Sequence, residues 1–408
     1  MHEESMNPYK LIEPPIKEPS QMRIAIVLFT NLGIGAGTEV VATSLAKCLS
    51  SSENYPRLNV TIFQTDYMYT SSTNPVIKES VLDRVDVITL RSPFNSRLLR
   101  YSEQATTLLP LLRKVLVSTM KPIVYIIANH SILKDTARRL DAVLLLNAYD
   151  AIPWHFVLPE LPIIISGECG YPNPTDGVLR KISMSILTRI SKGAHFVNRG
   201  QYELCHSVRS VDFILPNGVS ADLFVPVVHS EQRNLTKVLF VSRLDRGKGI
   251  VELLNAFSHL KQNNSFKLTV VGNGEFRNLV MNIKTVNIDY LGFVEHDRLP
   301  GVYSANDIFV FPSVGEGFGN VVLEALSCGL FCLVSKNLQG IFDEFESMGA
   351  LRYIDITPDA IANELSAHEG YRLSKETKLK VHEYIKENYD WPIIAHKMLS
   401  HIRTIINK

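Results

Sequence analysis

The sequence predicts an α/β protein of two domains, each built on a parallel β-sheet. Its 408 residues exceed one ordinary hydrophobic core, and two domains of roughly 200 residues each are expected for this length. Short apolar runs alternate with segments whose apolar residues recur at helical spacing, which is the pattern of βαβ units. A Pro-Asn-Gly turn at Pro216–Gly218 separates two stretches of this pattern.

Composition excludes several other classes of protein. Lys and Arg total 42 and Asp and Glu 41, so the formal charge of +1 gives no reason to expect nucleic acid as a partner. The five cysteines are scattered without a CxxC pair or zinc-finger spacing, which favours a reducing compartment. No apolar run approaches the roughly 20 residues of a membrane span. Residues 1–20 are polar and proline-containing, unlike a signal peptide. We therefore expect a cytoplasmic protein, soluble or peripheral on a membrane, with 1–20 as a flexible leader.

The first expected domain, residues 21–215, opens with a strand. Met22–Phe29 is a near-continuous apolar run of the kind found in strands buried on both faces. A glycine-rich segment at 31–37 follows, and Thr38–Leu49 then has helical spacing. Strand, glycine loop and helix together make a turn suited to a phosphate.

A dinucleotide fingerprint does not fit this turn. A GxGxxG motif begun at Gly33 has Thr38 at its sixth position, and one begun at Gly35 has Val40 there. Nicotinamide cofactors are therefore not expected.

The rest of this domain continues the alternation. The strand candidates are 60–63, 85–90, 123–127, 143–146 and 163–165, with a helix near 105–116 and a long turn at 167–174. A basic amphipathic helix at 178–192 suits either an ordinary surface or contact with an anionic membrane.

The second expected domain, residues 216–388, repeats the pattern. Lys237–Val241 is a strand candidate, and Ile250–Lys261 has helical spacing. The loop between them carries Arg243 and Lys248, and two such cations can neutralise a diphosphate. The plain alternative is a pair of solubilising charges. A Walker A loop is excluded because Gly249 stands where Ser or Thr must follow the lysine.

The remaining elements of this domain follow in order. The strand candidates are 268–271, 290–294, 308–311 and 331–334, and the helix candidates are 359–369, 375–388 and, beyond the domain, 391–406.

The most informative stretch is Asp307–Gly329. A buried strand ends at Pro312, three alternating glycines form a loop, and a helix is expected to begin with Asn320 as its cap and to end at Gly329. Glu316 and Glu324 lie beside this anion site, where each carboxylate suits a vicinal diol on a ribose or a sugar. The alternative is that both are ordinary solvated residues.

This stretch resembles the donor-site signature of the GT-B glycosyltransferases of family 4, in which a Glu-x7-Glu pair follows a proline-terminated strand and opens on Gly-Phe-Gly. The resemblance implies two Rossmann-like domains with parallel sheets that face an interdomain cleft. It also implies that Glu316 contacts the transferred sugar near its reacting carbon and that Glu324 holds the ribose hydroxyls. The backbone at Phe318, Gly319, Asn320 and Val321 would meet the sugar and the diphosphate.

Other segments extend the resemblance. Arg243 and Lys248 match an Arg-x4-Lys diphosphate clamp and, with Glu316, are the expected catalytic residues. By resemblance, residues 389–408 form a helix that returns to the first domain. The remaining donor-binding residues implied are Gly37 in the first domain and Asn273, Gly274, Phe293 and Val294 around the nucleotide.

The chain departs from the family pattern at three places. Ala36 replaces a glycine, Glu168 lies where a histidine is usual, with His130 and His155 on other loops, and Asp343 replaces a proline. Two of these departures, Ala36 and Glu168, fall in the expected acceptor-binding domain.

The resemblance implies a hexosyltransferase of glycan biosynthesis that uses a UDP- or GDP-linked sugar and retains anomeric configuration. The acceptor would be a sugar, a lipid-linked sugar or a protein. No metal or other cofactor is expected, because the clamp supplies positive charge and no Asp-x-Asp lies in a donor loop. The alternatives are a sugar-nucleotide epimerase or a phosphorylase on the same fold, or a non-catalytic partner subunit.

Overall fold

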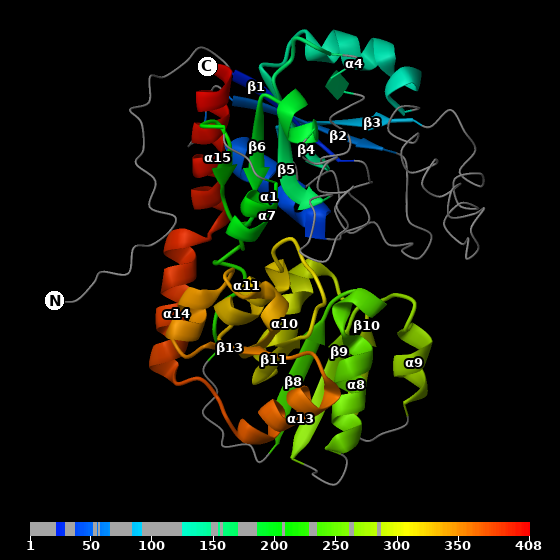
Figure 1. Cartoon of the computed structure of the whole chain (residues 1–408), viewed down its shortest axis with the longest axis vertical. Helices are drawn as coiled ribbons and strands as arrows, with labels where there is room; N and C mark the ends of the chain where they lie inside the picture. Colours follow the sequence, from blue (N-terminus) through cyan, green and yellow to red (C-terminus); the bar gives the residue numbers. More distant parts are fainter. Residues whose placement is uncertain are drawn as a thin grey trace, which may run out of the picture. The chain divides into compact units, whose positions relative to one another are not determined.

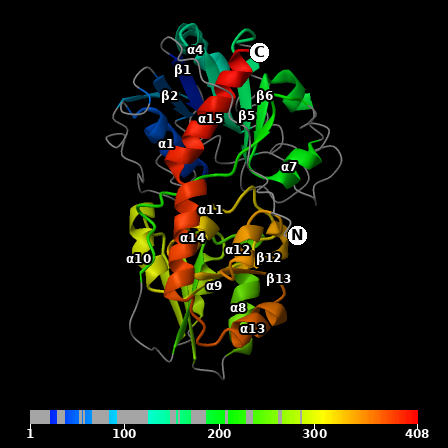
Figure 2. The ribbon, with the colours of Figure 1, turned by 90° about the vertical axis from the view of Figure 1, so that its left-hand side faces the viewer.

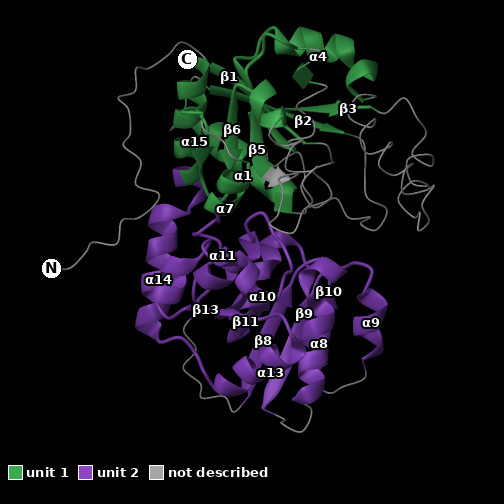
Figure 3. Cartoon of the chain, viewed as in Figure 1, with its two compact units in different colours: residues 1–216, 394–408 green, residues 217–393 purple. Residues whose placement is uncertain are grey.

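A computed structural model describes residues 22–28, 37–51, 55, 58–65, 84–91, 125–147, 154–155, 158–169, 186–205, 209–227, 235–260, 265–283 and 287–408. The chain divides into two compact units (Figure 3). Unit 1 comprises residues 1–216 and 394–408, and unit 2 comprises residues 217–393. The sequence analysis began the second domain at residue 216 and assigned 389–408 to a helix that returns to the first.

Unit 1 is built on a parallel sheet with the strand order β3-β2-β1-β4-β5-β6-β7 (Figure 1). Successive strands first extend to one side of β1 and then, from β4 on, to the other, so the sheet is doubly wound. The strands are β1 (Met22–Val27), β2 (Leu58–Thr65), β3 (Val85–Leu90), β4 (Ala142–Asn147), β5 (Ile163–Cys169), β6 (Gly193–Phe196) and β7 (Phe213–Ile214).

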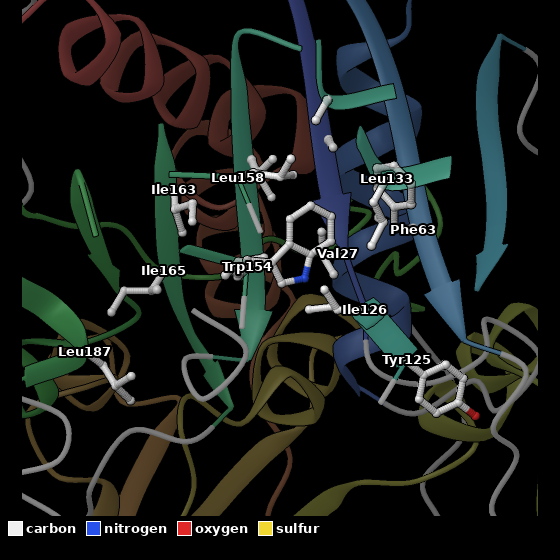
Figure 4. Packing of buried hydrophobic residues seen from close by; sticks show 14 of the residues in the cluster. Val27, Phe63, Tyr125, Ile126, Leu133, Trp154, Leu158, Ile163, Ile165 and Leu187 are labelled. Atoms are coloured by element: carbon white, nitrogen blue, oxygen red, sulfur yellow. The ribbon is translucent and has the colours of Figure 1, made fainter. Parts of the chain in front are cut away.

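One face of this sheet carries a hydrophobic core centred on Trp154 (Figure 4). The Trp154 indole meets the Phe63 ring edge to face, with the ring centroids 5.6 Å apart. Val27 from β1 and Leu133 from α4 belong to the same cluster. The described helices of the unit are α1 (Gly37–Leu49), α4 (His130–Ala137), α7 (Arg199–Leu204) and most of α15 (Trp391–Ile406).

The opposite face of the sheet holds α15, which runs along unit 1 (Figure 2). A Cβ on Gly193 would lie 2.5 Å from the Ile405 side chain, so the helix packs directly on β6. The Phe213 ring stacks between two histidines, His401 with ring centroids 4.1 Å apart and His195 with centroids 5.2 Å apart. Burial lowers the pKa of both histidines to about 4. The segment 394–408 is thus part of the core of unit 1.

Unit 2 has a parallel sheet with the strand order β10-β9-β8-β11-β12-β13, which is doubly wound in the same sense. The strands are β8 (Thr236–Val241), β9 (Phe266–Val271), β10 (Ile288–Gly292), β11 (Ile308–Phe311), β12 (Phe331–Ser335) and β13 (Leu351–Ile354). All four residues of β11 are buried, as expected for a central strand covered on both faces.

The helices of unit 2 cover both faces of its sheet (Figure 1). The two helices α8 and α13 pack against each other, and α11 packs against α14 and α10. The helices are α8 (Ile250–His259), α9 (Arg277–Asn282), α10 (Leu299–Ser304), α11 (Asn320–Ser327), α12 (Asp343–Ser347), α13 (Pro358–Ala367) and α14 (Lys375–Asn388). The predicted fold class, two α/β domains with parallel sheets, is confirmed.

Two strand predictions need correction. Residues 125–128 are helical although 123–127 was predicted as a strand, because a short apolar run does not by itself distinguish a buried strand from a buried helical turn. The strand predicted at 290–294 is shifted to β10, which ends at Gly292 with a φ of +69°. Phe293 and Val294 therefore follow the strand.

Several predicted features lie outside the described residues. They are the leader at 1–20, the glycine loop at 31–36, the helix at 105–116, most of the basic helix at 178–192 and the turn beyond Cys169. Among the helices that the structure describes, none combines the length and apolarity needed to cross a membrane.

Gly249 should be needed for the stability of unit 2. It has a φ of +72°, and an added Cβ would lie 2.1 Å from the carbonyl oxygen of Pro312. Gly370 has the same φ of +72° with nothing within 4 Å, so it is a matched control. Gly370→Ala should lose about 1 kcal/mol of unfolding free energy from backbone strain, and Gly249→Ala about 2–4 kcal/mol because overpacking adds to it. Urea unfolding measures both losses. Equal losses of unfolding free energy in the two variants would show that the close approach of Gly249 to Pro312 adds nothing to the cost of the substitution.

The histidine stack on α15 should make unit 1 sensitive to acid. The folded pKa of about 4 lies below the ordinary value of 6.5, so the stability linked to these groups is complete above pH 6.5 and is lost as the pH falls towards 4. For His195 alone the loss is on the order of 3 kcal/mol. His401→Phe keeps a ring on Phe213 and should reduce the fall in melting temperature between pH 7 and pH 5, whereas His130→Phe on exposed α4 should not. A fall unchanged in His401→Phe would contradict the assignment.

Candidate functional site

The three residues predicted to be catalytic lie on loops at the place where the strand order of the unit 2 sheet reverses. The strands β8 and β11 are neighbours at the centre of the sheet. The loop after β8 carries Arg243 and Lys248, and the loop after β11 carries Glu316. In open α/β sheets, loops at the carboxyl ends of strands flanking such a reversal form the ligand site.

The loops after β8 and β11 are bound directly to each other. The Val314 N–H and the Ser313 hydroxyl donate to the Gly247 carbonyl oxygen, at 2.9 and 3.0 Å. Lys248 ends a short 3₁₀ turn that begins at Arg246, and left-handed Gly249 leads from this turn into α8. The backbone therefore fixes Lys248 and the glycine loop with respect to each other.

Lys248 and Glu316, both predicted to be catalytic, form an ion pair. The Lys248 Nζ donates to Glu316 Oε1, and the side chains are 13% and 17% exposed. Ser313 lies 3.3 Å from the same carboxylate oxygen through its hydroxyl. Charges this far removed from water need partners, and each of these is the other's partner. The pair offers a substrate one cation and one anion side by side.

Arg243, the other predicted clamp residue, is exposed. Its side chain is 70% exposed, and its guanidinium Nη2 lies 3.2 Å from Asp245 Oδ2. An exposed ion pair of this kind contributes little free energy, so an incoming anion can compete for the guanidinium. The fork of N–H donors suits a phosphate.

Glu324 lies on α11 with both carboxylate oxygens hydrogen-bonded. Oε1 is 2.9 Å from His296 Nε2, and Oε2 accepts from the Tyr303 hydroxyl at 2.8 Å. Burial lowers the pKa of His296, but the hydrogen bond and charge of Glu324, with the charge of Asp297, outweigh it and raise that pKa. Burial and the Glu324 carboxylate raise the pKa of Tyr303 well above its usual value, so the phenol keeps its proton and donates.

The N-terminus of α11 differs from the prediction. Asn320 is not the cap: Gly319, with a φ of +94°, holds the N-cap position, and no side chain caps the helix. The Asn320 side chain instead accepts from Asn217 at 2.9 Å. Helix N–H groups without a side-chain cap can bind an anion, which the helix dipole also favours. Val321 follows in the first turn, and the Phe318 side chain is buried against the Phe342 ring.

The predicted C-terminus of α11 is confirmed. Gly329 has a φ of +80°, and the Leu330 and Gly329 N–H groups donate to the carbonyls of Ala325 and Leu326. This is a Schellman motif, which ends a helix at a glycine.

The loop after β9 packs its backbone on the loop after β8. A Cβ on Gly272 would lie 1.8 Å from the Ser242 carbonyl oxygen, and one on Gly274 would lie 2.5 Å from that of Leu244. The Asn273 carbonyl accepts from the Leu244 N–H at 2.9 Å. Asn273 and Gly274 are therefore held beside the loop that carries the predicted clamp.

Two further predicted residues follow the edge strand β10. Phe293 is 42% exposed, an unusual state for a phenylalanine, and Val294 is half-buried. An exposed ring at a strand end can stack on a nucleobase, and the assignment remains a prediction.

Gly37, the donor-binding residue predicted in unit 1, begins α1 and is exposed. Nothing lies within 4 Å of the position of an added Cβ, so packing does not require glycine there. Glu168 lies in β5, and His130 begins α4 on its exposed side. The role of Gly37 remains a prediction.

Sequence reasoning missed the residues that support the predicted ones. His296 and Tyr303 are hydrogen-bonded to Glu324, and Asn217 is hydrogen-bonded to Asn320. The Ser313 hydroxyl lies near the Glu316 carboxylate. Ser313 lies inside the stretch that the sequence analysis singled out. No spacing in the sequence connects His296 or Tyr303 with Glu324.

Comparison with known proteins finds a family match over the segment that holds most of these residues. Residues 226–366 match the family described as glycosyl transferases group 1. The chain is 25% identical to the phosphatidylinositol N-acetylglucosaminyltransferase gpi3 subunit of Schizosaccharomyces pombe over 194 residues, 45% of this chain and 41% of the relative. It is 33% identical over 147 residues to a Campylobacter jejuni enzyme named N-acetylgalactosamine-N,N'-diacetylbacillosaminyl-diphospho-undecaprenol 4-alpha-N-acetylgalactosaminyltransferase, 34% of this chain and 37% of the relative. The matched parts thus span about two fifths of these relatives.

Solved structures match nearly the whole chain. Sucrose-phosphate synthase of Thermosynechococcus elongatus has a TM-score of 0.69 at 16% identity, over 95% of this chain and 99% of that one. HepE of Anabaena, solved with UDP and glucose, has a TM-score of 0.66 at 16% identity, over 94% and 100%. Identity this low establishes the fold alone. The chain therefore has the two-domain α/β fold known as GT-B, and its residues 226–366 match the family described as glycosyl transferases group 1.

Proposed function

We propose that this protein is a glycosyltransferase that moves a hexosyl unit from a UDP- or GDP-linked sugar to an acceptor. The observation that carries the proposal is the Lys248–Glu316 ion pair at the strand-order reversal of unit 2. It lies within the segment that matches glycosyl transferases group 1, and α11, in the same segment, begins without a side-chain cap. A cation, a carboxylate and a helix N-terminus provide what a nucleoside diphosphate sugar requires.

In this proposal the cations of the β8 loop bind the diphosphate. Lys248 supplies a point charge and exposed Arg243 a planar fork. Both interactions strengthen as the bond between the anomeric carbon and the phosphate oxygen breaks, because negative charge then grows on the leaving group. The N-terminus of α11 would add its dipole through the Gly319–Val321 backbone.

Glu316 would hold the hydroxyls of the transferred sugar, and Glu324 those of the ribose. With the sugar fixed over the diphosphate, the acceptor hydroxyl attacks the anomeric carbon on the same face of the sugar from which the diphosphate leaves. Its proton passes to the departing diphosphate oxygen, so no protein side chain is needed as general base. Such a same-face route retains the anomeric configuration.

We further propose that the reaction needs no metal ion. In metal-dependent sugar transfer the ion neutralises the diphosphate, and here Lys248 and Arg243 would supply that charge. Transfer is accordingly expected to be equal with and without EDTA.

We propose a lipid-linked sugar as the acceptor, bound by unit 1, in preference to a free sugar or a protein. The two relatives named above support this choice, because their names contain phosphatidylinositol and a diphospho-undecaprenol-linked sugar. With such an acceptor, we propose that the protein acts at the cytoplasmic face of a membrane.

Nucleotide binding should depend on Lys248. UDP, GDP and ADP are tested by thermal shift, and a ligand at about 100 times its dissociation constant adds roughly 2.7 kcal/mol of stability. One nucleotide should stabilise the wild type and lose most of this effect in Lys248→Ala. Lys267→Ala is the control, because it removes an exposed ion pair, 2.7 Å to Asp289, from the same unit. Stabilisation by no nucleotide would refute the proposed donor site.

Turnover should depend on Glu316. Release of nucleoside diphosphate from UDP- and GDP-sugars is measured with a lipid-linked sugar fraction. Glu316→Gln should lower the rate about 10²–10³-fold. The variant keeps the size of the side chain but loses the negative charge that would lie beside the sugar in the transition state. Nucleotide binding should stay within a few-fold.

Exposed Glu346→Gln on α12 serves as the matched control and should keep full activity. Nucleotide binding without any transfer by the wild type would favour the non-catalytic partner subunit instead.

A further inference from the structure

The Glu324 carboxylate is immobilised by residues from two other elements. His296 comes from the short 3₁₀ turn after β10 and Tyr303 from α10, while Glu324 lies on α11. The two donors lie on different carboxylate oxygens, at 2.9 and 2.8 Å. With both oxygens held, the plane of the carboxylate is fixed.

A buried ring supports both donors. Phe224 is fully buried and meets His296 and Tyr303 edge to face, with ring centroids 5.2 and 5.8 Å apart. Tyr303 is itself fully buried, and the Glu324 side chain is 7% exposed. This packing leaves the three side chains little freedom to rearrange.

The held carboxylate still has capacity for a ligand. A carboxylate oxygen has two lone pairs, and His296 and Tyr303 each occupy one. As far as the described residues go, one lone pair on each oxygen thus remains, which matches the two hydroxyls of a vicinal diol. A flexible glutamate would lose side-chain entropy on binding such a diol, whereas this one has lost that freedom in the folded protein.

We propose that His296 and Tyr303 are positioning residues that hold Glu324 ready for the ribose diol of the donor, so that preference for a ribonucleotide over its 2′-deoxy form depends on His296. The proposal rests on the proposed function, because it requires a nucleotide in unit 2. The alternative is that both residues serve only to satisfy a buried carboxylate.

The ribonucleotide preference tests the proposal. The dissociation constants of UDP and 2′-deoxy-UDP, and of GDP and 2′-deoxy-GDP, are measured by calorimetry. Wild type should prefer the ribonucleotide about tenfold, because a hydrogen bond to a charged group is lost in the deoxy form. His296→Ala should bring this ratio close to one through weaker ribonucleotide binding, while binding of the deoxy form changes little.

Three further variants sharpen the test. His296→Gln should restore the preference, because its amide N–H can donate where His296 Nε2 does. Tyr303→Phe keeps the ring, removes only the donor and should reduce the preference. His259→Ala is the matched control, because it removes a histidine 3.1 Å from an exposed carboxylate in the same unit, and it should retain the full preference.

The outcomes separate the two roles. Equal weakening of both nucleotide forms in His296→Ala would assign His296 a structural role only and overturn the proposal. A full preference in both His296→Ala and Tyr303→Phe would overturn it as well. If His296→Ala does not fold, Tyr303→Phe and His296→Gln decide. Failure of the wild type to bind any nucleotide would instead refute the proposed function.

Discussion

The candidate site depends on how closely three strand-end loops of unit 2 approach one another. The backbones after β8, β9 and β11 pack so tightly that an added Cβ on Gly249, Gly272 or Gly274 would lie within 2.5 Å of a carbonyl oxygen. Each of these glycines also has a positive φ, so two independent constraints require glycine there. The tight packing anchors the loops that carry Lys248 and Glu316.

The sequence was sufficient where the signal is local. Apolar runs placed β8, β11 and β12, and the glycine after α11 located the end of that helix, because strand burial and a left-handed C-terminal residue are encoded by neighbouring residues. The same locality explains the failures. Residues 125–128 form a helical turn that no short apolar run distinguishes from a strand. The Asn320 side chain could accept hydrogen bonds from the first N–H groups of a helix, but the turn before it places left-handed Gly319 at the N-cap position.

The residues of the candidate site show the same difference between local and long-range signals. Glu316 could be singled out because glycines flank it, and Lys248 because a second cation, Arg243, shares its strand-to-helix loop. The support of Glu324 could not, because His296 lies 28 residues and Tyr303 21 residues before it. The packing of α10 against both η5 (His296–Arg298) and α11 brings these three together. Hydrogen bonds between elements leave no periodic trace in a sequence.

The different partners of the two glutamates suggest different tasks. Glu316 is paired with the full positive charge of Lys248, which is also one of the two cations proposed to bind the diphosphate. Glu324 is held by a phenol and an imidazole wedged against Phe224, so its surroundings stay fixed. Charged groups held beside the reacting atoms stabilise the charge that develops in a transition state. A carboxylate that only recognises a diol benefits from rigidity. The packing around each glutamate therefore argues for reaction at Glu316 and recognition at Glu324.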